Sequence, residues 1–127
     1  MKKIAYQLEF MIHASPQMLF AHLKTPEGLS EWFADDVTKK GNEYTFQWED
    51  YEETAMLLKD KIDKSVTFQW EADYDTPYSF QIEIVRDDIT QDITLVVSDF
   101  ATEDELAESK MFWEGKIAAL KHCIGSE

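Results

Sequence analysis

The sequence is poor in the residues that mark disulfide-bonded and nucleic-acid-binding proteins. Its 127 residues include one cysteine, Cys123, so no disulfide can form within the chain. Only 12 residues are Lys or Arg, against 26 Asp or Glu, which gives a formal net charge of −14. Binding to nucleic acid or to an anionic membrane needs Lys and Arg to displace counterions, so this charge disfavours both partners.

Long apolar runs are also missing. No stretch approaches the roughly 20 apolar residues of a membrane span, and the opening MKKIAYQLEF lacks the continuous apolar run of a signal peptide. We therefore expect a cytoplasmic protein with no membrane insertion. With 4 Gly and 3 Pro, and no repeat or linker, residues 1–127 predict a single domain that can bury a core without disulfides or metals.

The first part of the chain predicts a strand followed by two short helices. Residues 4–12 alternate between apolar and polar, which is typical of a half-buried strand. Ser15-Pro16 then supplies an N-cap and a proline at the first helical position, for a helix that runs to about Leu23. Thr25-Pro26 repeats this signal and begins the second helix.

Two adjacent aromatics stand in the acidic segment TPEGLSEWFADDV, at residues 25–37. Leu29, Trp32 and Phe33 are spaced i, i+3 and i+4, so they share one face of the second short helix. We predict that Trp32 seals one end of the core. Phe33 is predicted to form the lip of a cavity or a contact for a partner.

From about residue 36 the apolar pattern has a period of two. Residues 44–48, 66–70 and 78–84 alternate cleanly, and 93–97 follow the same pattern. Residues 54–62 alternate less cleanly, and we assign their even-numbered side chains, Met56 among them, to the apolar face. Strands at this spacing with one polar face predict an antiparallel meander that is exposed to solvent on one side.

The C-terminal part predicts one long helix. Thr102 and Glu105 have the spacing of a capping box, in which the Thr side chain accepts from the backbone amide of Glu105. The helix runs to about Cys123 and ends near Gly125. Its apolar stripe must lie on the apolar face of the sheet: Leu106, Trp113, Ile117, Leu120 and Ile124. We therefore expect an α+β fold, a curved sheet wrapped around the last helix, with room for a cavity between the two.

This order of elements resembles the helix-grip fold of the START-like superfamily, also called SRPBCC or Bet v I-like. The segment SPQMLFAHLKTPEGLSEWFADDV and the later FWEGKIAALK resemble the branch of the heat-shock-protein-ninety ATPase activators. The matching positions are Ser15, Pro16, Phe20, Leu23, Pro26, Leu29, Trp32 and Trp113. The resemblance implies a curved antiparallel sheet of six to seven strands, a long C-terminal helix and two short helices after the first strand. It fixes no activity, because the superfamily includes lipid binders, cyclases, hydrolases and co-chaperones.

No catalytic or metal-binding motif is visible. His13, His22 and His122 lie far apart in the sequence and form no HExxH or paired Cys/His pattern. A glycine-rich phosphate loop and a Gly-x-Ser-x-Gly elbow are both missing. The carboxylates of residues 49–53 fall in a predicted hairpin turn, where solvent would leave their pKa values unraised. We therefore predict no catalytic residue, no metal and no cofactor.

The aromatic face is the informative feature, and it has two interpretations. Its side chains either fill the core or line a modest apolar pocket, in which indole N–H and phenol O–H groups orient a ligand with one polar end. The candidates for a ligand cavity are Trp32, Phe33, Phe46, Trp48, Met56, Phe68, Trp70, Tyr78, Phe80, Trp113 and Ile117.

Two functional hypotheses follow. The first is a non-enzymatic domain that binds a small apolar or aromatic ligand between the sheet and the C-terminal helix. The alternative is a protein-interaction module, a homodimer or a client-binding domain like the ATPase activators, with Phe33 and Phe100 as exposed apolar contacts. An enzyme of the cyclase or hydrolase kind comes third, since the sequence offers it no nucleophile or base.

Overall fold

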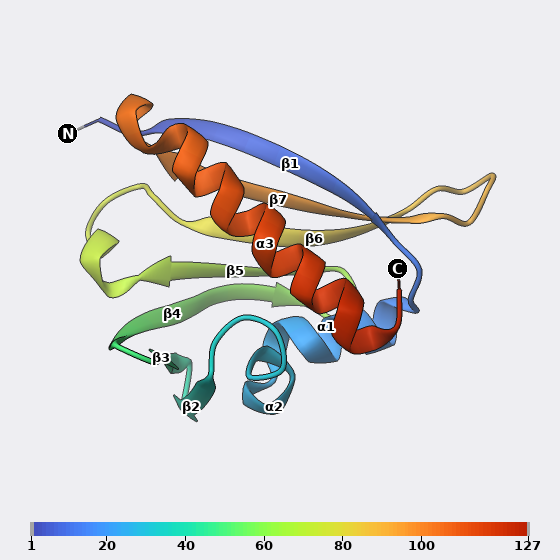
Figure 1. Cartoon of the computed structure of the whole chain (residues 1–127), viewed down its shortest axis with the longest axis horizontal. Helices are drawn as coiled ribbons and strands as arrows, with labels where there is room; N and C mark the ends of the chain where they lie inside the picture. The colour runs from blue at the N-terminus through green and yellow to red at the C-terminus, as the bar shows by residue number, and fades with distance from the viewer. Residues whose placement is uncertain (1, 127) are drawn as a thin grey trace.

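The computed structural model describes residues 2–126 and shows a curved antiparallel sheet around one long helix (Figure 1). The sheet has seven strands within these residues, in the order β1-β7-β6-β5-β4-β3-β2. The strands are β1 (Ile4–Ile12), β2 (Asp36–Lys40), β3 (Glu43–Trp48), β4 (Tyr51–Lys61), β5 (Ser65–Trp70), β6 (Phe80–Arg86) and β7 (Ile93–Ala101). Strands β2 to β7 form a meander, and β1 crosses to pair with β7 at the far edge.

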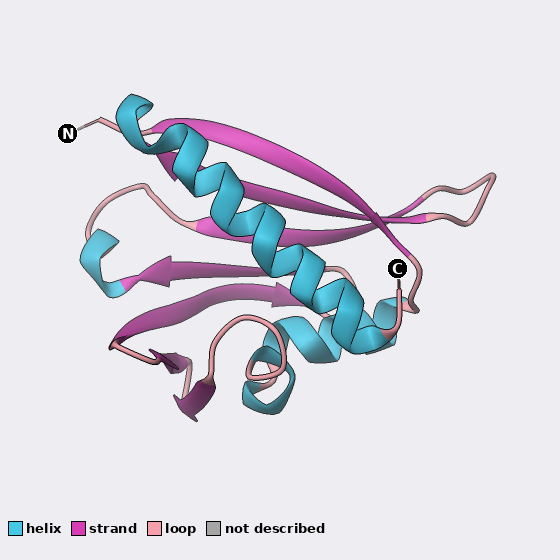
Figure 2. Ribbon diagram, viewed as in Figure 1, coloured by secondary structure: helices cyan, strands magenta, loops and turns pink. Residues whose placement is uncertain are grey.

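The long helix α3 (Leu106–Ile124) runs diagonally across one face of the sheet (Figure 2). The short helices α1 (Pro16–Lys24) and α2 (Pro26–Leu29) lie together at the end of the sheet where α3 finishes (Figure 1). Both begin at the predicted caps: Ser15 Oγ accepts from the backbone N–H of Met18 and Thr25 Oγ1 from that of Gly28. The single-turn 3₁₀ helices η1 (Glu71–Asp73) and η2 (Glu103–Glu105) follow β5 and β7.

The core lies between α3 and the sheet. Trp113, Ile117 and Leu120 of α3 are buried. The facing surface consists of the predicted alternating side chains of the strands: Tyr44, Phe46, Val66, Phe68, Phe80, Ile82, Leu95 and Val97. Burying apolar surface at about 25 cal/mol per Å² is the main stabilising contribution to such a layer. The α+β helix-grip architecture predicted from the sequence is therefore confirmed.

The start of α3 differs from the predicted capping box. Thr102 Oγ1 donates to Glu105 Oε1 at 2.9 Å instead of accepting from a backbone amide. The chain makes the 3₁₀ turn η2 here, with the backbone N–H of Glu105 bonded to the Thr102 carbonyl oxygen, and the α-helix begins only at Leu106. The two residues meet as predicted, but the Thr102 side chain accepts no backbone N–H group.

The assignment of faces in β4 was also wrong. Ala55 and Leu57 are buried, whereas Met56 is only partly buried and Leu58 is exposed. The register between β4 and β5 shifts between Leu57 and Lys59, which marks a bulge. A bulge inserts one residue and reverses the parity of the side chains beyond it, so no single alternation fits the whole strand.

Phe33 is not a lip residue. It is 2% exposed and lies at the centre of the aromatic core. Helix α2 ends at Leu29, but the backbone N–H groups of Trp32 and Phe33 still bond to the Leu29 carbonyl oxygen. This continued turn keeps the three side chains on one side, and all three are buried. The shared face was predicted correctly, and only the placement of Phe33 at the surface was wrong.

Candidate functional site

A cavity of about 390 Å³ lies between the sheet and the first half of α3. Its lining residues on α3 belong to the N-terminal half of that helix. This end of α3 lies at the opposite end of the sheet from α1 and α2 (Figure 1). Its walls come from the β3–β4 hairpin, the ends of β5 and β7, and α3. The lining residues are Lys3, Trp48, Tyr51, Glu53, Trp70, Asp99, Phe100, Ala101, Glu105, Glu108, Ser109, Phe112 and Trp113.

Aromatic rings form much of this wall. Tyr51 stacks on Trp48 with ring centroids 5.1 Å apart, and Phe112 meets Trp113 edge-on at 5.5 Å. Trp70 lies 6.4 Å from Trp48 and completes the group. Contacts of this kind between rings hold the walls in place, because each pair contributes about 0.5–1.5 kcal/mol beyond the area it buries.

Two of the indole N–H groups already have partners within the protein. Trp48 Nε1 donates to the Phe33 carbonyl oxygen at 3.0 Å, and Trp113 Nε1 donates to Asp99 Oδ2 at 2.9 Å. These bonds fix the orientation of the two rings. Because these two N–H groups are engaged, a ligand would contact the faces and edges of the rings.

Carboxylates accompany the rings. Glu53, Asp99, Glu105 and Glu108 all line the cavity, against the single cation Lys3. Lys3 Nζ is itself paired with Asp73 at 3.0 Å. The cavity therefore combines apolar surface with uncompensated negative charge.

Desolvation changes the acidity of two of these carboxyl groups. Desolvation raises the pKa of Asp99, although the hydrogen bonds from the Trp113 indole and the Phe100 backbone oppose this effect. Partial desolvation also raises the pKa of Glu53, and the neighbouring Asp73 charge adds to the increase. Glu53 lies within β4, opposite the buried Phe46, and not in the predicted turn, although its side chain is exposed.

The predicted cavity residues fall into three groups. Trp48, Trp70 and Trp113 line the cavity. Most of the others are buried in the core beyond it: Trp32, Phe33, Phe46, Phe68, Phe80 and Ile117. Met56 lies on the other face of β4, and Tyr78 precedes β6, where its ring packs against Phe100 at 5.1 Å.

Several residues that meet at this cavity were not predicted from the sequence. Phe112 was left out because it precedes Trp113 and falls off the apolar stripe of the helix. Asp99 was missed because one carboxylate in a strand carries no motif. Alternation along 93–97 continues to Asp99, however, and this signal places it on the face that α3 covers.

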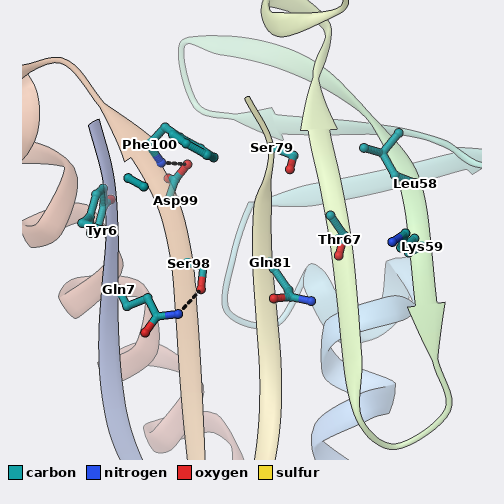
Figure 3. A pocket seen from close by; sticks show the side chains of 11 residues that line it. Tyr6, Gln7, Leu58, Lys59, Thr67, Ser79, Gln81, Ser98, Asp99 and Phe100 are labelled. Carbon is teal, nitrogen blue, oxygen red and sulfur yellow. Dashed lines mark hydrogen bonds between the residues drawn. The ribbon is translucent and has the colours of Figure 1, made fainter. Parts of the chain in front are cut away.

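A larger hollow of about 750 Å³ lies on the other face of the sheet (Figure 3). Short polar side chains dominate it, and Gln7 Nε2 donates to Ser98 Oγ at 3.2 Å across β1 and β7. Figure 3 shows Thr67 and Gln81 beside them on the neighbouring strands. Asp99 and Phe100 line both hollows. Of the two, only the smaller cavity is lined by the tryptophans, Glu53 and Glu108, so we consider the smaller cavity to be the candidate site.

The fold and this cavity between sheet and helix define a helix-grip protein, and the comparisons place it in a family. A family model for the START-like superfamily domain matches residues 1–126, so the chain belongs to this superfamily. Comparison with curated proteins finds no significant match. Within residues 2–126, no helix is both long and apolar enough to cross a membrane.

Solved structures with the same fold agree with this assignment. A solution structure of a Bacteroides fragilis protein is 27% identical, with a TM-score of 0.70, over 98% of this chain and 93% of that one. The Aha1 dimer from Colwellia psychrerythraea is 18% identical, with a TM-score of 0.76, over 93% of both chains. A conserved protein of unknown function from Enterococcus faecalis is 20% identical, with a TM-score of 0.74, over 96% of this chain and 71% of that one.

Proposed function

We propose that this protein binds a small organic cation, an amine or quaternary ammonium compound with an aromatic or aliphatic body, in the cavity between the sheet and α3. The observation that carries the proposal is the combination of Trp48, Trp70 and Phe112 with the carboxylates Glu53 and Glu108 around one cavity. Aromatic faces attract cations through the ring quadrupole, by about 0.5–2 kcal/mol per contact. Carboxylates add Coulombic attraction, and apolar walls take up the body of the ligand.

The charge of the cavity distinguishes this ligand class from a neutral or anionic one. Since Lys3 is engaged by Asp73, a bound carboxylate or phosphate would face four acidic side chains without a free cation among the lining residues. A neutral ligand would gain from the rings alone. A cation gains from both the rings and the acids, so it makes the fullest use of the site.

A pair of matched probes tests the proposal. Phenyltrimethylammonium and tert-butylbenzene have nearly the same shape and differ by one positive charge. We expect tryptophan fluorescence to report at least about tenfold tighter binding of the cation, with affinity that falls as salt is added. Failure of both probes to bind would refute the cavity as a ligand site, and equal affinities would reduce it to a plain apolar pocket.

Two variants locate the binding. Trp70→Ala removes one aromatic wall and should weaken binding of both probes. Glu53→Gln should weaken only the cation, by about fivefold, because it removes one nearby charge and little shape. Glu83→Gln, on the exposed face of β6, is the matched control and should change neither affinity.

A second candidate is self-association through α3. Met111 and Phe112 are both exposed apolar side chains on this helix, and the structurally similar Colwellia protein is described as a dimer. Phe33, which the sequence suggested as a contact, is buried and cannot take part. Light scattering over a hundredfold range of concentration tests this candidate, and a constant monomer mass would refute it.

A further inference from the structure

We propose that His22, Glu31 and Cys123 form a binding site for a zinc ion at the end of the molecule opposite to the cavity. Their ligand atoms, an imidazole nitrogen, a carboxylate oxygen and the thiol sulfur, all lie within 4.8 Å of one another. The three residues come from α1, the turn after α2 and the last turn of α3. The sequence could not reveal this group, because Cys123 lies 92 positions after Glu31.

The spacing is close to that of a metal centre. In a tetrahedral zinc site, with bonds of about 2.0 Å to nitrogen or oxygen and 2.3 Å to sulfur, neighbouring ligand atoms are roughly 3.3–3.8 Å apart. His22 Nε2 and Glu31 Oε2 are already 3.5 Å apart. Glu31 is exposed, so rotation of its side chain and that of Cys123 can close the remaining gap.

The imidazole of His22 is held in the orientation that a metal requires. Its Nδ1 lies 2.9 Å from the Met18 carbonyl oxygen, which can only accept, so Nδ1 carries a proton. Nε2 then turns a lone pair toward the carboxylate and the thiol unless it too is protonated. The Nε2 lone pair and the Glu31 carboxylate repel each other, and a cation bound between them would remove this repulsion. A backbone carbonyl that fixes the second nitrogen is the usual support of a metal-binding histidine.

The supporting elements are firmly positioned. Helices α1 and α2 approach closely at Gly28, which leaves no space for a Cβ between it and the backbone of Ala21. The C-terminal end of α3 is tied to the chain after β1, because the backbone N–H of His13 donates to Ser126 Oγ at 2.7 Å. The three ligands therefore stand on elements that the fold already holds together.

The chemistry of the donors selects the metal. Thiolate and imidazole together favour Zn²⁺ over Mg²⁺ and Ca²⁺, which take oxygen ligands. Three protein ligands leave a fourth position for water. Burial and the charge of Glu31 raise the pKa of the Cys123 thiol, so zinc binding must displace a proton from the sulfur into solvent.

The test uses the purified full-length chain, stripped of metal by a chelator. Titration with Zn²⁺ against a chromogenic indicator should show one high-affinity site per chain. Replacement by Co²⁺ should give a sulfur-to-cobalt charge-transfer absorption, which only a coordinated thiolate produces. Less than one zinc per chain, or a cobalt spectrum without this absorption, would overturn the proposal.

Matched variants assign the ligands. Cys123→Ser and His22→Gln should each weaken zinc binding by at least about tenfold. Even the loss of a residue that only supports a ligand weakens metal binding by about that factor. Glu31→Gln should weaken it in the same direction. His13→Gln and Glu27→Gln, on exposed neighbours, should leave it unchanged. Equal affinity in all five variants would show that zinc binds nonspecifically to surface carboxylates, and it would overturn the proposed site.

A measurement on the unmodified protein avoids any dependence on the folding of variants. Zinc should slow alkylation of Cys123 by iodoacetamide at least about tenfold, since a coordinated sulfur is a poorer nucleophile than a free thiolate. An unchanged rate at saturating zinc would contradict the proposal. The result is independent of the organic-cation cavity, which lies at the other end of α3.

Discussion

Phe33 is the residue on which the packing of the core depends most. Its ring contacts seven other aromatic rings, with centroid distances of 5.3 to 6.3 Å. These rings belong to β3, β5, β6, α3 and the turn after α2. One side chain thus joins the sheet, the long helix and the short helices.

We expect Phe33→Ala to lower the free energy of unfolding by about 3–5 kcal/mol, because it leaves a cavity that rigid neighbouring rings cannot fill. Urea denaturation followed by tryptophan fluorescence measures the change. Ile89→Ala is the control: Ile89 is 92% exposed and its truncation should alter stability by less than about 0.5 kcal/mol. Similar losses in the two variants would contradict this account of the core.

Glu53 gives a prediction for pH dependence. Its pKa in the folded protein is raised above the ordinary value of 4.5, so the folded state holds more protons than the unfolded state between these two pKa values. The free energy of unfolding therefore falls as pH rises through that window. Glu53→Gln removes the ionisable group and with it this pH-dependent loss of stability. The melting temperature of the variant should therefore decline less from pH 4 to pH 7.

Glu52→Gln is the matched control for that experiment, since it removes the same charge from the adjacent residue of β4. Melting curves across the pH range compare the three proteins. If Glu53→Gln and Glu52→Gln have identical profiles, the desolvation of Glu53 in the folded protein has no effect on stability.

At the scale of elements, two glycines in helices should respond in opposite ways to the same substitution. A Cβ at Gly28 would lie 2.4 Å from the Ala21 carbonyl oxygen and 2.6 Å from the His22 Cα, both backbone atoms of α1. A Cβ at Gly115, within α3, would meet nothing within 4 Å. Gly28 is thus required for the contact between α1 and α2, and Gly115 is not required for any contact.

We expect Gly28→Ala to destabilise the protein by about 1–3 kcal/mol, because α2 must move away from α1. Gly115→Ala should instead stabilise it by up to about 1 kcal/mol, through the higher helix propensity of alanine. Thermal unfolding of the two variants measures both effects. A stable Gly28→Ala protein would show that the α1–α2 contact is looser than described.

At the scale of the whole molecule, the net charge of −14 is the dominant electrostatic feature. Within residues 2–126, lysine forms two ion pairs, Lys3–Asp73 and Lys24–Asp60. Partly exposed pairs of this kind contribute about 0–1 kcal/mol each. Repulsion among the remaining acids should therefore outweigh them.

Added salt screens this repulsion more than it weakens the two pairs, so we expect the melting temperature to rise by a few degrees from about 10 mM to 500 mM NaCl. Differential scanning calorimetry without added metal measures the shift. A melting temperature that falls with salt would show that attractive pairs dominate. Sodium chloride is the suitable salt, because sulfate would also strengthen apolar burial.

The architecture follows from signals in the sequence alone. Alternation along β1, β3, β5 and β6, the Ser-Pro and Thr-Pro caps, and the stripe of Trp113 and Ile117 are local signals. Each depends on the spacing of residues that are neighbours in the chain, and together they leave one arrangement that buries all the apolar faces. Local signals were less reliable in β4, where a bulge changes the parity of the side chains.

The positions of the two candidate sites depend on how the elements pack. The packing of α3 divided the aromatic face into a filled core around Phe33 and a smaller cavity lined by acids. It also brought Cys123 beside His22 and Glu31. These outcomes depend on distances between residues far apart in the chain, and on volumes that side chains fill or leave open. The spacing of residues along a sequence predicts neither these distances nor these volumes.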